Sequence, residues 1–519
     1  MEARNFVTAR EMVQQGNWLL PTMNDLPRVT KPPLPTWLSA VMMKVSGNVD
    51  SLAVLRFPAG LAASCMVFFM FGFSRKFAKN TLSPFLNALV LASCFYVIFL
   101  GRQGTWDIFC HSFMLLGIWW LHKGWHGTKQ NYGWFLGAGL AMGLSFLSKG
   151  PVSFYTVLLP FLIASFICFD SGDARRRWKG MLLTFVTTLI VGGAWPLYVF
   201  LNMPDVATAV AQTESGSWIN RNVRPFWYYW NFPAHSGIWL VMGVVVLVWP
   251  YARPRINQLT NYNFFLFWLL AAILLLSVVP EKKVRYLLPA FIPFSFLVGN
   301  YLSYLIDVYK KKSETAWDRR ILLTNTIIFL AIAFSVPIAC YFQFYRHGLM
   351  STTYFVFCLL LYWTLAWGIG YYHKTKSILL LVLTIVALNA TVYFLLYPLA
   401  SPLIYKNPNH QSLTSVRNLP DMKGADLYYL NDQNEIRMER VWEIGRPVKQ
   451  WPVTDKCQPP QATPFILFTK QPPEQLFEAC PTQLRYELIA TFDYRREKSG
   501  DIYYVSRLIP DSNKNINEN

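Results

Sequence analysis

Long apolar runs, separated by short polar segments, fill the chain from residue 52 to residue 398. A helix needs roughly 20 apolar residues to cross a bilayer core of about 30 Å. By that measure the pattern predicts about twelve membrane spans: 53–74, 83–101, 104–122, 132–148, 152–169, 181–201, 236–251, 262–279, 286–306, 321–343, 352–372 and 377–398. The weakest of them is 132–148, because Gly137, Gly139 and Gly143 would equally suit close packing between helices.

The segment before the first span, residues 1–51, is amphipathic. Phe6, Ala9 and Met12 recur at helical spacing, and Gly16 follows the helix that they predict. A polar turn at 23–28 and a second short apolar helix through Met43 come next. We expect both helices to lie in the membrane interface, beside the bundle 52–398.

The composition becomes polar near residue 400, with proline-rich joints. Four strands and two helices are predicted there: 426–430, 465–468, 486–492 and 501–505, with helices at 434–444 and 473–479. We therefore expect a small soluble α/β domain over 399–510 and a disordered tail over 511–519. Cys457 and Cys480 could form a disulfide if this domain lies outside the cytoplasm.

Composition and charge support a membrane all-α bundle. Hydrophobic residues make up 54% of the 519 residues and charged residues only 14%, which excludes a soluble globular class. The net charge of +19 is spread over the loops on one side of the bundle, so no nucleic-acid site is indicated. By the positive-inside rule that side is cytoplasmic. The basic groups that define it are at 75–79, 122–123, 175–179, 253–255, 310–312 and 374–376.

An even number of spans would place both ends of the chain on the outer face. The sequence begins at Met1 with no apolar stretch ahead of the amphipathic helix. Either the first span translocates this segment, or an upstream helix is missing and the full bundle has about thirteen spans. We favour the missing helix.

Charged residues beside the spans on the outer face are the candidates for chemistry, because charge at membrane depth is costly. Asp107, at the mouth of two spans, could act as a general base, with Arg102 orienting its carboxylate. Alternatively, Asp107 caps the helix that follows it. Lys149 precedes Gly150-Pro151 in a tight turn and could present its ammonium to a phosphate, or simply extend toward the headgroups.

Further cations break the positive-inside rule on this face. Lys31 precedes two prolines, and Arg4, Arg224 and the group 282–285 before Tyr286 add more positive charge. Several cations suit the phosphate of a membrane-embedded donor. We expect Lys31, Lys149, Arg224 and the Arg285-Tyr286 pair to line one cavity at the outer leaflet.

Several of these motifs resemble one family. They are Glu2 to Phe6, 16–21, Lys31 to Trp37, Arg102 to Asp107, 147–151, 225–229 and 285–289. In this order they resemble the polyprenol-phosphate-sugar glycosyltransferases of the GT-C class, in particular the aminoarabinose lipid A transferases and the protein O-mannosyltransferases. The resemblance implies a multi-span enzyme of the bacterial inner membrane with its site and C-terminal domain facing the periplasm.

The resemblance also implies roles. Undecaprenyl phosphate would carry the sugar, which is 4-amino-4-deoxy-L-arabinose or another pentose or hexose, to lipid A or another surface acceptor. The lipid phosphate would be held by Arg4, Lys31, Arg102, Lys149, Arg224, Arg285 and Tyr286. Asp107 and Glu2 would position and deprotonate the acceptor hydroxyl. A protein acceptor stays open, as do a transporter or flippase and an inactive scaffold. The sequence indicates no oligomeric state.

Three positions depart from the family pattern. Met1 stands where the family has an Asp, and Thr30 stands where a Glu is common. No His lies between Met203 and Pro233, and His235 comes only at the end of the long outer loop. The usual Glu and His of a divalent-metal site are therefore unmatched, and no metal is assigned.

Overall fold

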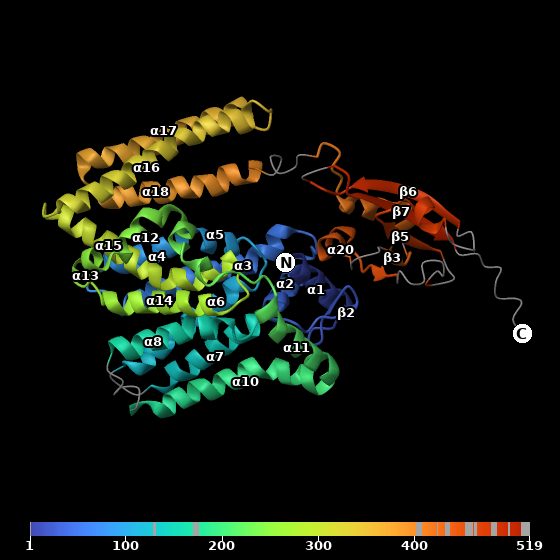
Figure 1. Ribbon diagram of the computed structural model, residues 1–519, viewed down its shortest axis with the longest axis horizontal. Coiled ribbons are helices and arrows are strands. Elements are labelled where there is room, and N and C mark those ends of the chain that lie inside the picture. Colours follow the sequence, from blue (N-terminus) through green and yellow to red (C-terminus); the bar gives the residue numbers. More distant parts are fainter. Residues whose placement is uncertain are drawn as a thin grey trace, which may run out of the picture. The chain divides into compact units, whose positions relative to one another are not determined.

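The computed structural model describes residues 2–127, 131–169, 176–400, 407–422, 424–430, 436–451, 460, 464–478, 485–496 and 499–509. The chain divides into two compact units (Figure 1). We call Val29–Pro398 the bundle, and Met1–Arg28 together with Leu399–Asn519 the terminal unit.

The bundle is built almost entirely of helices (Figure 1). Its α-helices are α2 (Leu34–Ser46), α3 (Leu52–Ser74), α4 (Leu82–Ser93), α5 (Phe95–Gly101), α6 (Asp107–Trp125), α7 (Tyr132–Lys149), α8 (Leu159–Cys168), α10 (Trp178–Asn202), α11 (Pro204–Asn220), α12 (Leu240–Leu247), α13 (Trp249–Ile256), α14 (Tyr262–Val278), α15 (Phe291–Lys310), α16 (Ala316–Cys340), α17 (Thr352–Thr375) and α18 (Ile378–Thr391). Short 3-10 and π segments join them: η1 (Phe154–Leu158), η2 (Phe226–Tyr229), η3 (Phe232–Trp239), η4 (Val284–Ala290), η5 (Tyr341–Tyr345), η6 (Val392–Leu396) and η7 (Tyr397–Ala400).

Every predicted span overlaps a helix, and the predicted class, a polytopic helical membrane fold, is confirmed. Among the described residues, seven helices are long and apolar enough to cross a membrane, or up to eight if α4 and α5, bent by 62°, form one span. Phe154–Cys168 and Tyr262–Val278 are shorter apolar helices. The larger predicted number of spans stays a prediction.

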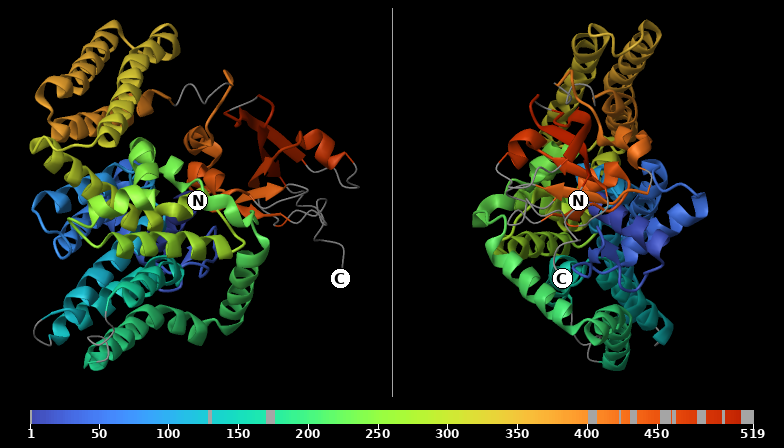
Figure 2. Two further views of the ribbon diagram at one scale, coloured as in Figure 1. Left: turned by 60° about the vertical axis from the view of Figure 1, so that its left-hand side comes forward. Right: turned by 90° about the vertical axis from the view of Figure 1, so that its right-hand side faces the viewer.

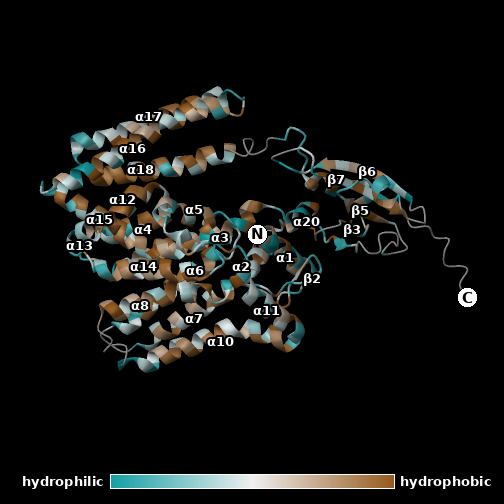
Figure 3. Ribbon diagram, viewed as in Figure 1, coloured by the Kyte–Doolittle hydropathy of each residue, from teal (hydrophilic) through white to brown (hydrophobic). Residues whose placement is uncertain are grey.

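The outward faces of the long helices suit lipid. Helices α10 and α17 contain hydrophobic stretches, coloured brown in Figure 3. Large apolar side chains on these two helices are exposed: Leu182, Phe185, Leu189, Ile190, Trp363 and Trp367. An exposed apolar surface of this extent is unfavourable in water and favourable in hydrocarbon. These helices therefore face the membrane core.

Helix α7 packs between α6 and α10, side by side with both (Figure 1). A Cβ atom on Gly139 would lie 2.6 Å from the Cβ of Thr187, and one on Gly143 would lie 2.6 Å from the Cβ of Val191. Both neighbours belong to α10. The glycines in the weakest predicted span thus permit the close helix contact that their pattern suggested.

The long outer loop that the sequence predicts ahead of His235, residues 202–235, contains the 17-residue helix α11 and the short η2. Pro204 stands at the start of α11, with Asp205 in its first turn, and both favour a helix start. None of its residues is buried. Without a buried face there is no apolar period to detect, which is why the sequence pattern missed this helix.

The terminal unit holds a five-stranded mixed sheet in the order β4-β3-β5-β7-β6. Strands of this sheet appear as orange and red arrows in Figure 2. The strands are β3 (Leu427–Leu430), β4 (Lys449–Gln450), β5 (Phe465–Thr469), β6 (Arg485–Asp493) and β7 (Ile502–Ile509). Strand β3 runs parallel to β4 and β5, and β7 runs antiparallel to β5 and β6. Helices α20 (Met438–Ile444) and α21 (Pro473–Phe477) complete it.

The four strands and two helices that the sequence predicts in this domain are present. Strand β4 was not predicted, because two residues are too few to show an alternation of apolar and polar positions. Leu413–Asn418 and Pro420–Met422 add 3-10 turns η8 and η9. Cys457, Cys480 and the tail 511–519 lie outside the described residues.

The first helix, α1 (Glu2–Gln15), folds with this domain, and β1 (Thr22–Met23) pairs with β2 (Leu26–Pro27) beside it. Val7 joins the core that contains Tyr429, Val441 and Phe468. The N-terminal segment was predicted as one interfacial loop over 1–51, and the structure differs: its first 28 residues belong to the terminal unit and α2 belongs to the bundle. The apolar face of α1 is covered by protein.

Polar contacts fix α1 in place. Arg10 donates to the carbonyl oxygens of Val441 at 3.1 Å and Trp442 at 3.3 Å, in the last turn of α20. Glu11 accepts from the Thr22 hydroxyl at 2.6 Å and the Asn24 amide at 2.7 Å. Burial raises the pKa of the Glu11 carboxyl, and these hydrogen bonds oppose the rise.

Candidate active site

A buried ion pair joins the ends of two bundle helices. Asp107 is the first residue of α6 and Lys149 is the last residue of α7. The Lys149 ammonium donates to Asp107 Oδ1, and the Asp107 side chain is 2% exposed. A carboxylate is favoured at a helix N-terminus and an ammonium at a C-terminus, so both helix dipoles support the pair. Gly150, with φ of +70°, then turns the chain where a side chain would be strained.

Small polar groups hold this corner together. Cys110 Sγ donates to the Asp107 carbonyl at 3.3 Å, and the Ser145 hydroxyl donates to the Cys110 carbonyl at 2.7 Å. Ser145 and Ser153 share a hydrogen bond of 2.6 Å. These hydrogen bonds fix α6, α7 and the start of η1 relative to one another, next to the ion pair.

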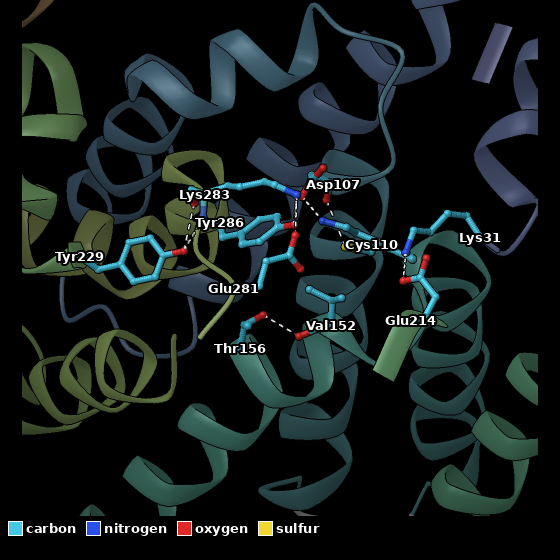
Figure 4. A network of polar contacts seen from close by, with 11 residues as sticks. Lys31, Asp107, Cys110, Val152, Thr156, Glu214, Tyr229, Glu281, Lys283 and Tyr286 are labelled. Atoms are coloured by element: carbon cyan, nitrogen blue, oxygen red, sulfur yellow. Dashed lines mark hydrogen bonds and ion pairs between the residues drawn. The ribbon is translucent and has the colours of Figure 1, made fainter. Parts of the chain in front are cut away.

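The segment 279–286 contributes more charge to the same place (Figure 4). The Lys149 Nζ lies 4.6 Å from the centre of the Tyr286 ring, a cation–π contact. Lys283 Nζ lies 2.6 Å from Glu281 Oε1 and 3.4 Å from the Tyr286 hydroxyl. The structure therefore brings Lys149, Tyr286 and Lys283 together around Asp107.

Arg285 belongs to the same cluster. Its guanidinium lies 5.6 Å from the centre of the Tyr286 ring, and it acts electrostatically on Asp107. Its Nε is buried and has no hydrogen-bond partner among the described residues. A buried donor without an acceptor is costly, so this N–H is suited to donate to an acceptor oxygen that enters the site.

Two predicted residues of the bundle have other partners. Lys31 forms an ion pair with Glu214 of α11, with 2.6 Å between Nζ and Oε2. Arg102 was expected to orient Asp107, but it donates to the Tyr393 carbonyl at 3.2 Å and lies 5.3 Å from the centre of the Tyr397 ring. The exposed guanidinium gains these contacts while Lys149 already neutralises the buried carboxylate.

The other predicted residues are placed as follows. Arg224 is exposed, and its backbone amide donates to the Pro280 carbonyl at 3.3 Å, beside the segment of Tyr286. Glu2 and Arg4 lie on α1 in the terminal unit. That Lys31, Lys149, Arg224 and Tyr286 share one cavity remains a prediction.

Sequence reasoning missed Glu214 altogether. It lies 183 residues from Lys31, in a helix that the pattern did not reveal, and only its charge within an outer loop could have marked it. The pairing of Asp107 with Lys149 was missed as well, although both residues were candidates.

The described residues hold no group of three or more His, Cys, Asp or Glu side chains that could bind a metal ion. The family implies metal ligands at two positions. At the first, Thr30 offers only a hydroxyl, which is a weak metal ligand. At the second, the His235 ring packs against Tyr96, with 6.0 Å between the ring centres. The residues present do not fit a metal centre.

Comparison with known proteins adds independent findings. A family model for dolichyl-phosphate-mannose-protein mannosyltransferases matches residues 30–196. An undecaprenyl phosphate-α-4-amino-4-deoxy-L-arabinose arabinosyl transferase of Pseudomonas fluorescens is 28% identical over 319 residues, 58% of this chain and 55% of the relative. Its counterpart in Edwardsiella ictaluri is 24% identical over 59% of this chain and 55% of the relative. The chain thus spans about half the length of the curated relatives it matches.

Two crystal structures of ArnT from Cupriavidus metallidurans have the same fold. The form bound to undecaprenyl phosphate gives a TM-score of 0.71 at 15% identity, covering 98% of this chain and 93% of that one. The apo form gives 0.70 at 16% identity with the same coverage. The chain therefore has the polytopic helical membrane fold of ArnT and, as its motifs predicted, resembles in sequence the polyprenol-phosphate-sugar glycosyltransferases of the GT-C class.

Proposed function

We propose that this chain is an integral-membrane glycosyltransferase that takes a sugar from an undecaprenyl-phosphate carrier and transfers it to lipid A or another surface acceptor. The observation that carries the proposal is the buried Asp107–Lys149 pair, with Tyr286, Lys283 and Arg285 around it. The names of the similar arabinosyl transferases support the lipid-linked donor and suggest 4-amino-4-deoxy-L-arabinose as the sugar.

The cations provide the donor site. Arg285, whose buried Nε has no hydrogen-bond partner among the described residues, and Lys149 bind the phosphate that joins the lipid to the sugar. The phosphate competes with Asp107 for the Lys149 ammonium. Its arrival releases the carboxylate, so the base becomes free only when the donor is bound. Arg224, Lys31 and Arg102 supply further positive charge on the approach.

The transfer itself exchanges one bond for another. The acceptor hydroxyl oxygen attacks the anomeric carbon, and the bond from that carbon to the phosphate oxygen breaks. The bonding electron pair leaves with the polyprenyl phosphate, whose growing charge Lys149 and Arg285 neutralise. Asp107 accepts the hydroxyl proton. Glu2 and Arg4 join the proposal on the resemblance of their motif alone.

The cation distribution supports an orientation. Basic loops on one side favour a cytoplasmic location for that side, so the site would face the periplasm from the inner membrane. Transport is less well supported, because transporters place ionisable residues near the middle of broken helices, whereas Asp107 and Lys149 stand at helix ends.

The direct test incubates the purified full chain in detergent with polyprenyl-phosphate-linked aminoarabinose or hexose and with lipid A or a protein acceptor. We expect sugar transfer to lipid A, detected by a mass increase of the product. Transfer only to the protein would indicate a mannosyltransferase-like acceptor instead. No transfer from any donor, with intact folding, would contradict the proposal and favour a scaffold or transporter.

A further inference from the structure

Lys282 is one of the cations of the outer-face group 282–285, and its hydrogen-bond partners differ from those of Lys149 and Lys283. Its side chain is buried, with 3% exposure. Its ammonium donates to the backbone carbonyl of Val279 at 2.7 Å and to that of Arg224 at 3.2 Å. Both acceptors are neutral, and they lie in different segments of the bundle.

The two segments form an irregular antiparallel pair. The Arg224 amide donates to the Pro280 carbonyl at 3.3 Å, and the Lys282 amide donates to the Asn222 carbonyl at 3.2 Å. Val223 and Glu281 are bridge partners. These are few hydrogen bonds for a pair of loops, and the Lys282 side chain adds a cross-link that the backbone does not provide.

The neighbouring Tyr229 ties the same segments together. Its hydroxyl donates to the Lys283 carbonyl at 3.1 Å and accepts from the Lys283 amide at 3.0 Å (Figure 4). Lys283 in turn contacts the Tyr286 hydroxyl. A continuous set of contacts thus runs from Arg224, through Lys282 and the loop 279–283, to Tyr286.

Burying an ammonium that faces only carbonyl groups is costly for folding. Burial lowers the pKa of Lys282 accordingly. An apolar side chain of the same length would fill this space without that cost. The lysine is therefore best explained by the geometry it imposes on the residues beside it.

We propose that Lys282 is a positioning residue for the phosphate of the lipid-linked donor: it holds the Arg224 segment against the Lys283–Tyr286 segment and does not itself contact the phosphate. This inference rests on the proposed function. Lys282 acts by fixing the positions of Arg224 and Tyr286, while Lys149 and the residues around it bind the phosphate.

The test compares Lys282→Met, which keeps a long unbranched side chain but removes the donors, with Lys282→Arg, which keeps charge and donors. Lys311→Met, an exposed lysine at the end of α15, is the matched control. The probe is a short-chain polyprenyl phosphate binding to the purified full chain in detergent. We expect Lys282→Met to weaken binding about tenfold, Lys282→Arg to recover most of it, and Lys311→Met to leave it unchanged.

A positioning role also predicts a split in kinetics: Lys282→Met should raise KM for the donor while kcat at saturating donor changes little. Equal losses in binding for the Met and Arg variants would overturn the proposal, since side-chain shape and not the hydrogen bonds would then matter. So would unchanged binding in Lys282→Met.

Backbone hydrogen exchange separates this inference from the proposed function. In Lys282→Met the Arg224 and Lys283 amides should exchange faster than in the parent chain, with or without ligand, and Lys311→Met should show no change there. Unchanged exchange would reject the cross-link itself. If exchange rises but the parent chain binds no polyprenyl phosphate, the cross-link stands while the proposed function, and the role of Lys282 in it, are rejected.

Discussion

At the scale of single residues, Asp107 carries the most specific expectation. Asp107→Asn keeps the shape of the side chain but removes the base and the charge that holds Lys149. We expect the rate of sugar transfer to fall on the order of 100- to 10,000-fold. Polyprenyl phosphate should bind as tightly as before or more tightly, because Lys149 no longer has a competing partner.

Asp307→Asn, near the end of α15, is the control for this change and should leave both quantities unaltered. A parallel loss of transfer and donor binding in Asp107→Asn would mean that Asp107 holds the site together and does not act as the base.

Glu214 offers a second residue-scale test, because it neutralises Lys31. Both side chains of this pair are about one-third exposed, at 30% and 32%. Solvent-exposed pairs are worth about 0–1 kcal/mol, so freeing Lys31 should have a modest effect. We expect Glu214→Gln to tighten polyprenyl phosphate binding about threefold, as measured by titration in detergent.

Glu314→Gln is the control for Glu214→Gln, since it removes another ion pair of a carboxylate with a basic side chain, here Arg319, away from the candidate site. Weaker phosphate binding in Glu214→Gln would show that Glu214 supports Lys31 and does not compete with the ligand.

The sequence showed which charged residues lie beside predicted spans, where charge is energetically unfavourable, but it could not show which residues they contact. Asp107 and Lys149 were both singled out by their place beside spans, yet 42 positions separate them, and their contact depends on how α6 and α7 pack. Lys282 illustrates the same limit. A lysine on the predicted outer face suggests a function, whereas its burial and its two carbonyl acceptors follow from tertiary structure alone.

At the scale of elements, the contact of α7 with α10 gives a stability prediction. A Cβ on Gly139 would lie 2.6 Å from the Cβ of Thr187 and 2.7 Å from the Thr184 carbonyl oxygen. The backbone carbonyl cannot move aside alone, so Gly139→Ala should separate the helices. We expect a loss of about 1–3 kcal/mol, seen as a lower melting temperature in detergent.

Gly193→Ala in α10 is the control, because nothing lies within 4 Å of its added Cβ. It should leave stability unchanged or raise it slightly, since alanine favours helix over glycine. If both variants melt at the same temperature, the close packing of α7 on α10 does not contribute to stability.

Elements with a strong apolar period were predictable, and those without one were not. The apolar runs that contain α16, α17 and α18 are long enough to cross a membrane. In hydrocarbon, backbone polar groups must be hydrogen-bonded within the protein, so an apolar run of this length predicts a helix. Helix α11 buries none of its residues and was taken for a loop. The amphipathic pattern of α1 predicted a helix, but it could not tell lipid from protein as the partner of the apolar face.

At the scale of the whole chain, the terminal unit combines the first 28 residues with the last domain. Such closure cannot be predicted from local patterns, since the segments it joins are more than four hundred residues apart. It also has a kinetic consequence. The contacts of α1 with α20 can form only after the C-terminal domain has been synthesised. They also require closure of a loop of more than four hundred residues, which slows their formation.

Arg10 is the residue that tests this closure. Its side chain is 1% exposed and donates to two carbonyls at the end of α20. Arg10→Met fills a similar volume but leaves those carbonyls without the guanidinium. We expect a loss of about 1–3 kcal/mol in the terminal unit and faster amide hydrogen exchange throughout α1, measured on the full chain.

Arg437→Met provides the control just before α20, since Arg437 is exposed and makes no side-chain cap for that helix. Exchange in α1 should stay at the parent level in this variant. Arg10→Lys should fall between the two, because one ammonium cannot match the fork of a guanidinium. If exchange in α1 is the same in Arg10→Met as in the parent, the apolar face and the Glu11 hydrogen bonds hold α1, and the guanidinium contributes nothing to joining the two ends of the chain.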